Sequence, residues 1–282
     1  MTTSGEGIER TILATDGFEL AATVYGVGPD VVMLSAATAT PRQFYKSFAM
    51  FLAGEGYTVV TYDYRGIGES RPESLRGFDC SASDWGLLDM QGVLDWITAE
   101  YAPTILFAVG HSVGGQVTGM LTGSDRITAM ATVSAQSGYW GLQGDGEVTK
   151  MRIASHLVLP VVTPLFGYFP WSKISSAQDL PKGAALQWAR WCRDPKYILG
   201  DSTLPLDRYR NFTAPILAYS IDDDGWGTAK SVESMMSAYP NVEYQHLVPK
   251  DEGIDSLGHF GYFRPKSEPI WQQTLDWLRD KA

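Results

Sequence analysis

The stretch L-F-A-V-G-H-S-V-G-G-Q-V, residues 106–117, decides the fold of this 282-residue chain. It leads from an apolar run typical of a buried strand, Thr104–Val109, into Gln116–Leu121, which is compatible with a helix. The turn between them matches the pattern Gly-x-Ser-x-Gly at residues 110–114. A Gly-rich turn can also be a plain connection or a phosphate-binding loop, but neither Gly-x-Gly-x-x-Gly nor Gly-Lys-Ser is present at this turn. The order of strand, turn and helix therefore favours a serine held for chemistry.

Ser112 is the candidate nucleophile of this turn. A serine on so sharp a turn needs strained backbone angles, and the neighbouring backbone comes close to the strand and the helix. Gly110 and Gly114 fit this requirement because they carry no Cβ, while His111 stands between the strand and the serine. We therefore interpret these residues as one structural unit.

Apolar runs like the one before the turn recur along the chain. Ile8–Leu13 and Leu20–Tyr25, joined by Asp16-Gly17, predict a hairpin. Helix-like spacing separates the later runs, as in Asp84–Tyr101, and the last helix includes Leu275–Leu278. This alternation predicts an α/β fold with a mostly parallel eight-stranded sheet, opened by an antiparallel pair and covered by helices on both faces. The other predicted strands are Val31–Leu34, Tyr57–Tyr62, Thr104–Val109, Ile127–Val133, Ile216–Ile221 and Val242–Val248.

One long interval breaks this alternation. Between Gln136 and about Asp207 no buried strand is visible, whereas prolines are frequent and four of the nine tryptophans lie there. A structureless loop of this length is uncommon in a compact domain. We expect residues 136–207 to form a largely helical cap over a core made of residues 1–135 and 208–282. The alternative is a helical pair packed beside the sheet with no role in binding.

A serine nucleophile requires a base, and the chain has four histidines that could serve as one. For a nucleophile on this kind of turn the partners follow in the order serine, acid, histidine, which excludes His111 and His156. His246 lies in an alternating run that predicts a strand. His259 follows a loop rich in Gly and Asp beyond the last strand, so His259 is the favoured base and His246 the alternative.

Three consecutive carboxylates follow the predicted strand Ile216–Ile221. Adjacent charges repel one another, so such a run usually includes residues that only cap a turn. The length of a tight turn selects Asp224 as the acid, with Asp223 as the alternative. Its task is to hold the imidazole tautomer and to stabilise its charged form.

An acyl-transfer site also needs two backbone donors for the oxyanion. The N–H after the nucleophile belongs to Val113, and the second donor comes from the loop after the third strand. By register this second donor is Ala37, in a run of small residues that suits a close approach to the substrate. The alternative is that these are simply small loop residues without a role in binding the oxyanion.

Taken together, these residues resemble the α/β-hydrolase superfamily. The resemblance rests on Gly110–Gly114, the segment D-Y-R-G-I-G-E-S at 63–70, the Asp cluster and Leu257-Gly258-His259, and it spans the chain except the insertion. It implies a Ser-His-Asp triad and a mainly structural role for Arg65. Residues 181–192 and 222–226 look like a branch of bacterial serine hydrolases related to serine aminopeptidases and monoacylglycerol lipases. Where the superfamily commonly has a His-Gly pair after the third strand, this chain has Ser35-Ala36. The departure lies next to the expected second oxyanion donor.

The charge and cysteine content narrow the classes of partner. With 22 Lys+Arg against 32 Asp+Glu, the net charge of −10 opposes nucleic-acid and anionic membrane partners. Cys80 and Cys192 lie far apart, which argues against a metal cluster and a disulfide framework. No secretory signal or membrane span is visible, so we expect a cytoplasmic protein without metal or cofactor. The oligomeric state is left open.

These observations predict a serine hydrolase that cleaves a small or medium acyl ester through an acyl-enzyme. Thioesterase, amidase, lyase or cofactor-free oxidoreductase chemistry could use the same residues. A ligand-binding protein without catalysis is the alternative of a different class. Because Ser112 holds the turn, enzymes with an aspartate nucleophile are disfavoured.

Overall fold

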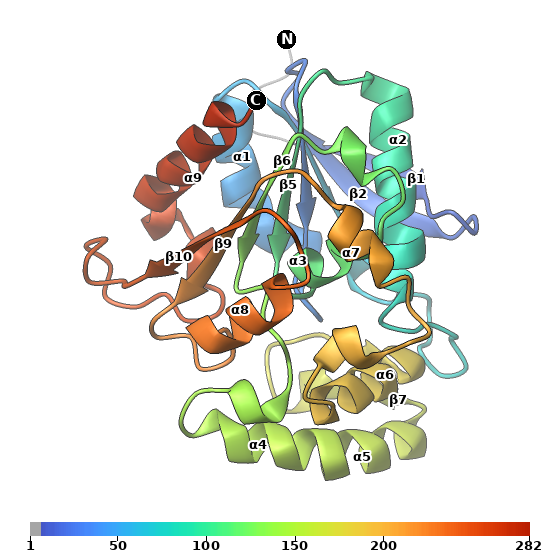
Figure 1. The fold of residues 1–282 in the computed structure, drawn as a ribbon. Coiled ribbons are helices and arrows are strands. Elements are labelled where there is room, and N and C mark those ends of the chain that lie inside the picture. The colour runs from blue at the N-terminus through green and yellow to red at the C-terminus, as the bar shows by residue number, and fades with distance from the viewer. Residues whose placement is uncertain (1–6) are drawn as a thin grey trace.

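The central element of the molecule is an eight-stranded sheet (Figure 1). The structure, a computed structural model, describes residues 7–282. The strand order is β1-β2-β4-β3-β5-β6-β9-β10, in which β1 and β2 are antiparallel to their neighbours and the other strands are parallel. The strands are β1 (Ile8–Leu13), β2 (Glu19–Tyr25), β3 (Val31–Ser35), β4 (Thr58–Tyr62), β5 (Leu106–His111), β6 (Ala129–Val133), β9 (Ile216–Ile221) and β10 (Val242–Leu247).

The predicted α/β fold is confirmed, because all eight predicted strands are present. Every residue of β3, β4, β5, β6 and β9 is buried, as expected for strands covered on both faces. The edge strands β1 and β10 are mostly exposed. One boundary matters for function. The sequence placed the end of β5 at Val109, but Gly110 and His111 pair with Thr132 and Val133 of β6, so the strand runs directly to Ser112.

Helices cover both faces of the sheet (Figure 1). Helices α1 and α9 contact each other on one face, and α2 lies on the other. None of the helices in the described part of the chain is both long and apolar enough to cross a bilayer. The α-helices are α1 (Lys46–Gly54), α2 (Gln91–Tyr101), α3 (Val113–Val117), α4 (Glu147–Ile153), α5 (Leu159–Phe166), α6 (Lys182–Arg193), α7 (Asp207–Asn211), α8 (Ala229–Met236) and α9 (Glu268–Asp280).

Tighter and wider helical turns extend several of these helices. The 3₁₀ turn η1 (Arg42–Tyr45) leads into α1, and the helix expected from Asp84 begins as the π-helical η3 (Trp85–Met90). A second π-helical stretch, η7 (Ala154–Val158), joins α4 to α5. The other 3₁₀ turns are η2 (Gly68–Ser70), η4 (Thr118–Met120), η5 (Ser124–Arg126), η6 (Trp140–Leu142), η8 (Trp171–Lys173), η9 (Tyr197–Gly200), η10 (Gly261–Phe263) and η11 (Pro265–Ser267).

Residues 136–207 lie below the sheet in Figure 1. They contain α4, α5 and α6 and one short antiparallel pair, β7 (Tyr168–Phe169) with β8 (Leu180–Pro181). The segment is therefore largely helical, and the helices lie beyond α3 and α8, which follow β5 and β9. Its division from the core at residues 135 and 208 remains a prediction.

Two buried arginines fix the loops on the sheet. Arg65 donates to Asp16 at 2.8 Å and to Asp89 at 2.6 Å, and it does not line the cavity described below. Arg42 donates to Asp63 at 2.5 Å, which ties the turn after β3 to the end of β4. Removing one partner of such a buried pair is costly, because the other charge remains without water. The segment 63–70 thus stabilises the framework.

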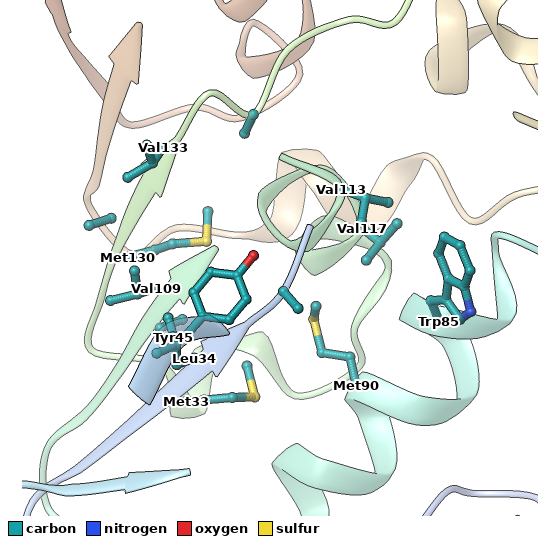
Figure 2. Packing of buried hydrophobic residues seen from close by; sticks show 14 of the residues in the cluster. Met33, Leu34, Tyr45, Trp85, Met90, Val109, Val113, Val117, Met130 and Val133 are labelled. Carbon is teal, nitrogen blue, oxygen red and sulfur yellow. The ribbon is translucent and has the colours of Figure 1, made fainter. Parts of the chain in front are cut away.

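The core between sheet and helices is continuous. Figure 2 shows part of it, with Met33 and Leu34 of β3, Val109 of β5 and Val133 of β6. Tyr45 is also labelled, with its hydroxyl oxygen in red; its side chain is 1% exposed. This packing makes the central strands a rigid base for the residues at their carboxyl ends.

Candidate active site

Ser112 follows β5 and precedes α3, in a strained conformation with φ 51° and ψ −116°. A non-glycine residue in such a region costs about 1–3 kcal/mol and persists only where its surroundings enforce it. The Ser112 N–H donates to the Val133 carbonyl at 2.9 Å, and the Gly115 N–H donates to the Ser112 carbonyl at 3.0 Å. The side chain is nearly buried but lines a cavity.

The glycines around Ser112 are required by close backbone contacts. A Cβ at Gly110 would lie 2.5 Å from the Gly115 nitrogen, and a Cβ at Gly114 would collide with the Ser35 carbonyl oxygen. The turn can therefore form only when both positions lack a side chain. Gly114 also brings the turn against the loop after β3.

Asp224 and His259 meet at the same end of the sheet. His259 Nδ1 lies 2.7 Å from Asp224 Oδ2, although the two residues are 35 positions apart in sequence. The same oxygen accepts from Ser134 Oγ at 2.7 Å, and Oδ1 accepts from the Trp226 N–H at 2.9 Å. Burial alone would raise the pKa of Asp224, but His259 and the hydrogen bond from Ser134 hold it well below its usual range. Asp224 is therefore an ionised carboxylate with every oxygen occupied.

Ser112 and His259 line one cavity but are not hydrogen-bonded to each other. Among the residues that the structure describes, the Ser112 hydroxyl contacts only the Gln136 side-chain oxygen, at 3.4 Å. A contact of this length is weak. Catalytic hydrogen bonds are often long or absent before the substrate binds, and a rotation about one side-chain bond moves a serine hydroxyl.

Asp223, the alternative acid, serves a different part of the site. Its carboxylate accepts from Ser256 Oγ at 2.7 Å, from the Leu257 N–H at 3.0 Å and from the Gly258 N–H at 2.8 Å. Burial opposes these hydrogen bonds, but they outweigh it and lower the pKa of Asp223. Asp223 therefore anchors the loop that carries His259 and does not contact the imidazole.

His246, the alternative base, lies outside the cavity. It is on β10, where it contacts Ser220 Oγ at 2.8 Å and Asp222 Oδ1 at 3.4 Å. Its side chain is 42% exposed. The alternating pattern of the sequence indicated such a strand position.

Ala37, the expected second oxyanion donor, lines the cavity with Ser112. Its N–H donates to Tyr45 Oη at 2.8 Å, so this donor is already used within the protein. The Thr38 and Val113 N–H groups have no acceptor among residues 7–282, and Thr38 lines the cavity with Ser112. The register of the sequence could not show this difference, because the competing acceptor comes from η1.

His111 is buried and connects two parts of the site. Its Nδ1 lies 2.8 Å from Tyr45 Oη, and its Nε2 lies 2.8 Å from the backbone carbonyl oxygen of His259. Burial lowers the pKa of His111 well below that of a free histidine, and the neighbouring His259 lowers it further. The sequence carries no signal for Tyr45 or Gln136 at this site. The one signal for Ser134 is its position directly after β6.

The cavity has a volume of about 720 Å³ and lies between the sheet and residues 136–207. Its walls come from the loop after β3, the Ser112 turn, the His259 loop and several aromatic residues. Trp171 and Trp188 stack there with ring centroids 5.7 Å apart. Among residues 7–282, no Asp, Glu or Lys lines it, and Arg264 is the one arginine that does. It can therefore hold a mostly uncharged molecule beside Ser112.

Comparison with known proteins places the chain in a family. Residues 31–268 match the model of the alpha/beta hydrolase family. Among characterised proteins, the quorum-quenching protein AidA of Acinetobacter baumannii is 24% identical over 273 residues, covering 89% of this chain and 86% of that protein.

Solved structures share the fold at low sequence identity. The esterase Pf2001 of Pyrococcus furiosus superposes with a TM-score of 0.61 at 16% identity, over 98% of this chain and 93% of the other. The putative non-heme bromoperoxidase BpoC of Mycobacterium tuberculosis gives 0.61 at 18% identity, over 93% and 96% of the two chains. The esterase EaEST of Exiguobacterium antarcticum gives 0.59 at 18% identity, over 96% and 100%. With a family match over most of its length, an eight-stranded sheet of this topology and a serine at the strained turn, the chain belongs to the alpha/beta hydrolase family.

Proposed function

We propose that this protein is a serine hydrolase that cleaves a carboxylic ester through an acyl-enzyme. The observation that carries the proposal is the 2.7 Å contact between His259 Nδ1 and Asp224 Oδ2, at a cavity shared with Ser112 on its strained turn. A carboxylate can only accept, so His259 carries its hydrogen on Nδ1. The lone pair on Nε2 is then available to a serine hydroxyl.

In the first half of the reaction Ser112 Oγ attacks the ester carbonyl carbon, and its proton moves to His259 Nε2. The tetrahedral intermediate collapses by breaking the carbon–oxygen bond to the alcohol, which takes that proton as it leaves. Asp224 stabilises the imidazolium that forms between these steps. In the second half water attacks the acyl group, gives its proton to His259 and releases the acid as Ser112 recovers its hydrogen.

The oxyanion accepts hydrogen bonds from the N–H groups of Val113 and Thr38 in this proposal. Both groups lack an acceptor among the described residues, whereas the Ala37 N–H is bound to Tyr45. A preorganised donor of this kind contributes about 3–4 kcal/mol to transition-state stabilisation. Thr38 thus replaces Ala37 as the second donor.

Ser112 leaves its contact with Gln136 before it attacks. That contact is long, at 3.4 Å, so little is lost when the hydroxyl turns toward His259. Gln136 then has a free side-chain oxygen at the cavity wall, where it can accept from a substrate donor.

The cavity favours an uncharged ester of small or medium size. In the described part of the chain its lining holds no carboxylates or lysines, and stacked tryptophans contribute apolar surface. The name of the relative AidA adds a candidate class, namely quorum-sensing signals that contain an ester bond. A substrate series should therefore combine simple p-nitrophenyl esters of increasing acyl length with such signal molecules, thioesters and amides.

The proposal is tested with wild-type protein and Ser112→Ala. Without the hydroxyl, we expect kcat for p-nitrophenyl acetate to fall by about 10³-fold or more. Ser202→Ala is the matched control, because Ser202 is exposed and lies outside the cavity; it should keep the wild-type rate. A Ser112→Ala protein that hydrolyses the ester at the parental rate would refute the proposal.

A further inference from the structure

We propose that Tyr45 and His111 form a buried hydrogen-bonded bridge that holds the loop after β3 and the His259 loop in fixed positions around Ser112. Tyr45 and His111 are positioning residues here, since neither is placed against the substrate. The inference rests on the proposed hydrolase function and adds to it the contacts that keep the two loops in fixed positions relative to each other.

The direction of each hydrogen bond in the bridge follows from its partners. The backbone carbonyl of His259 can only accept, so His111 Nε2 carries the hydrogen across the 2.8 Å contact. In a neutral imidazole the other nitrogen is then an acceptor, and Tyr45 Oη–H donates to His111 Nδ1 at 2.8 Å. Tyr45 Oη accepts in turn from the Ala37 N–H. One unbroken chain therefore runs from the loop after β3 to the His259 loop.

This chain requires a neutral His111. If His111 were protonated, both ring nitrogens would be donors, and the Tyr45 hydroxyl hydrogen would lose its acceptor on His111 in a buried place. Burial favours the neutral form, with His111 at 0% and Tyr45 at 1% exposure. The ring of His259 lies 5.0 Å from that of His111, so the charge on His259 during catalysis also opposes a second charge.

Packing around the bridge leaves it little freedom. The ring of Phe263 lies 4.9 Å from Tyr45 and 4.9 Å from His111, and Phe260 lies 5.4 Å from His111. Phe260 and Phe263 belong to the segment that directly follows His259. Phe263 is fully buried against both members of the bridge, and Phe260 also packs 5.1 Å from the His259 ring.

The bridge is anchored on β5, a strand in which every residue is buried. His111 ends β5, pairs with Val133 of β6 and precedes Ser112 by one residue. Both loops are thus connected by hydrogen bonds to His111, the residue next to the nucleophile. Displacing catalytic groups by about 1 Å can lower a rate about 10²-fold, so loss of the bridge should reduce turnover without removing any reacting group.

The decisive variant is Tyr45→Phe, which removes only the hydroxyl of the bridge. Tyr64→Phe is a matched control, because Tyr64 is equally buried but its hydroxyl has no hydrogen-bond partner in the described structure. For Tyr45→Phe we expect kcat and the rate of fluorophosphonate labelling at Ser112 to fall about 10- to 100-fold, with KM changed by less than about threefold. Tyr64→Phe should stay within about twofold of wild type in both readouts.

The outcomes separate the bridge from the proposed function. A folded Tyr45→Phe protein, shown by circular dichroism and a melting temperature above the assay temperature, that labels and turns over like wild type would overturn the bridge alone. Failure of wild-type protein to label would instead refute the serine hydrolase function.

A second pair of variants keeps the inference testable if Tyr45→Phe does not fold. His111→Gln retains a side-chain donor and acceptor, whereas His111→Ala retains neither. We expect His111→Gln to label faster than His111→Ala. Equal labelling by folded His111→Ala and wild type would contradict the bridge.

Discussion

At the scale of single residues, two adjacent carboxylates carry separate tasks. Asp224 contacts the imidazole of His259, and Asp223 holds the backbone of the loop that presents it. Neighbouring side chains in an extended turn point in different directions, so one chain segment can supply both functions. The third carboxylate of the run, Asp222, has a different neighbour, since its Oδ1 lies 3.4 Å from His246 Nε2.

Replacing these two carboxylates should therefore give unequal losses. For Asp224→Asn we expect kcat to fall about 10³- to 10⁴-fold, because the amide cannot hold the correct tautomer or stabilise the imidazolium. For Asp223→Asn we expect a loss of about 10- to 100-fold, since the loop moves but every reacting group remains. Steady-state hydrolysis of p-nitrophenyl acetate measures both. Equal losses would show that the two residues do not divide the work in this way.

At the scale of elements, the Ser112 turn depends on space that only glycine leaves. In Gly114→Ala the new Cβ meets the Ser35 carbonyl at the end of β3, which is backbone and cannot swing aside. We expect a loss of unfolding free energy of about 1–3 kcal/mol, together with reduced activity. Urea unfolding followed by circular dichroism measures the stability.

Gly54→Ala is the matched control for that substitution. A Cβ at Gly54 meets nothing within 4 Å, and the residue lies in α1. Alanine should stabilise the protein by about 0.5 kcal/mol there, because it reduces the entropy of the unfolded chain. A Gly114→Ala variant as stable as Gly54→Ala would contradict the close contact at the turn.

The elements were predictable from sequence because burial leaves a strong pattern. Strands β1 and β9 have the predicted bounds, since apolar runs bounded by turn residues specify them well. The position of Asp224 after β9 and of His259 after β10 followed from chain order. The hydrogen bond from the Ala37 N–H to Tyr45 could not be predicted, because contacts between separate elements leave no local pattern in the sequence.

At the scale of the whole molecule, the cavity is shared by two parts of the chain. The core supplies Ser112 and His259, and residues 136–207 supply Trp171 and Trp188. We interpret this segment as a cap that selects the substrate. The sequence predicted that this segment is largely helical, because a structureless loop of its length is uncommon in a compact domain.

Shortening one cap tryptophan should widen the range of substrates. Trp188→Ala removes a stacked ring from the wall, so the ratio of kcat/KM for long over short acyl esters should rise about tenfold. Trp277→Ala, on α9 and outside the cavity, should leave that ratio unchanged. A series of p-nitrophenyl esters measures the ratio. No change in Trp188→Ala would place substrate selection elsewhere.

The most direct test of the proposed triad is the mass of the protein after reaction with a fluorophosphonate. Attack by the serine oxygen on phosphorus expels fluoride and leaves one stable adduct per chain. We expect that adduct on the peptide containing Ser112, no adduct in Ser112→Ala, and labelling slowed by about 10³-fold or more in His259→Ala. An adduct on another residue, or a His259→Ala protein that labels at the wild-type rate, would contradict the triad.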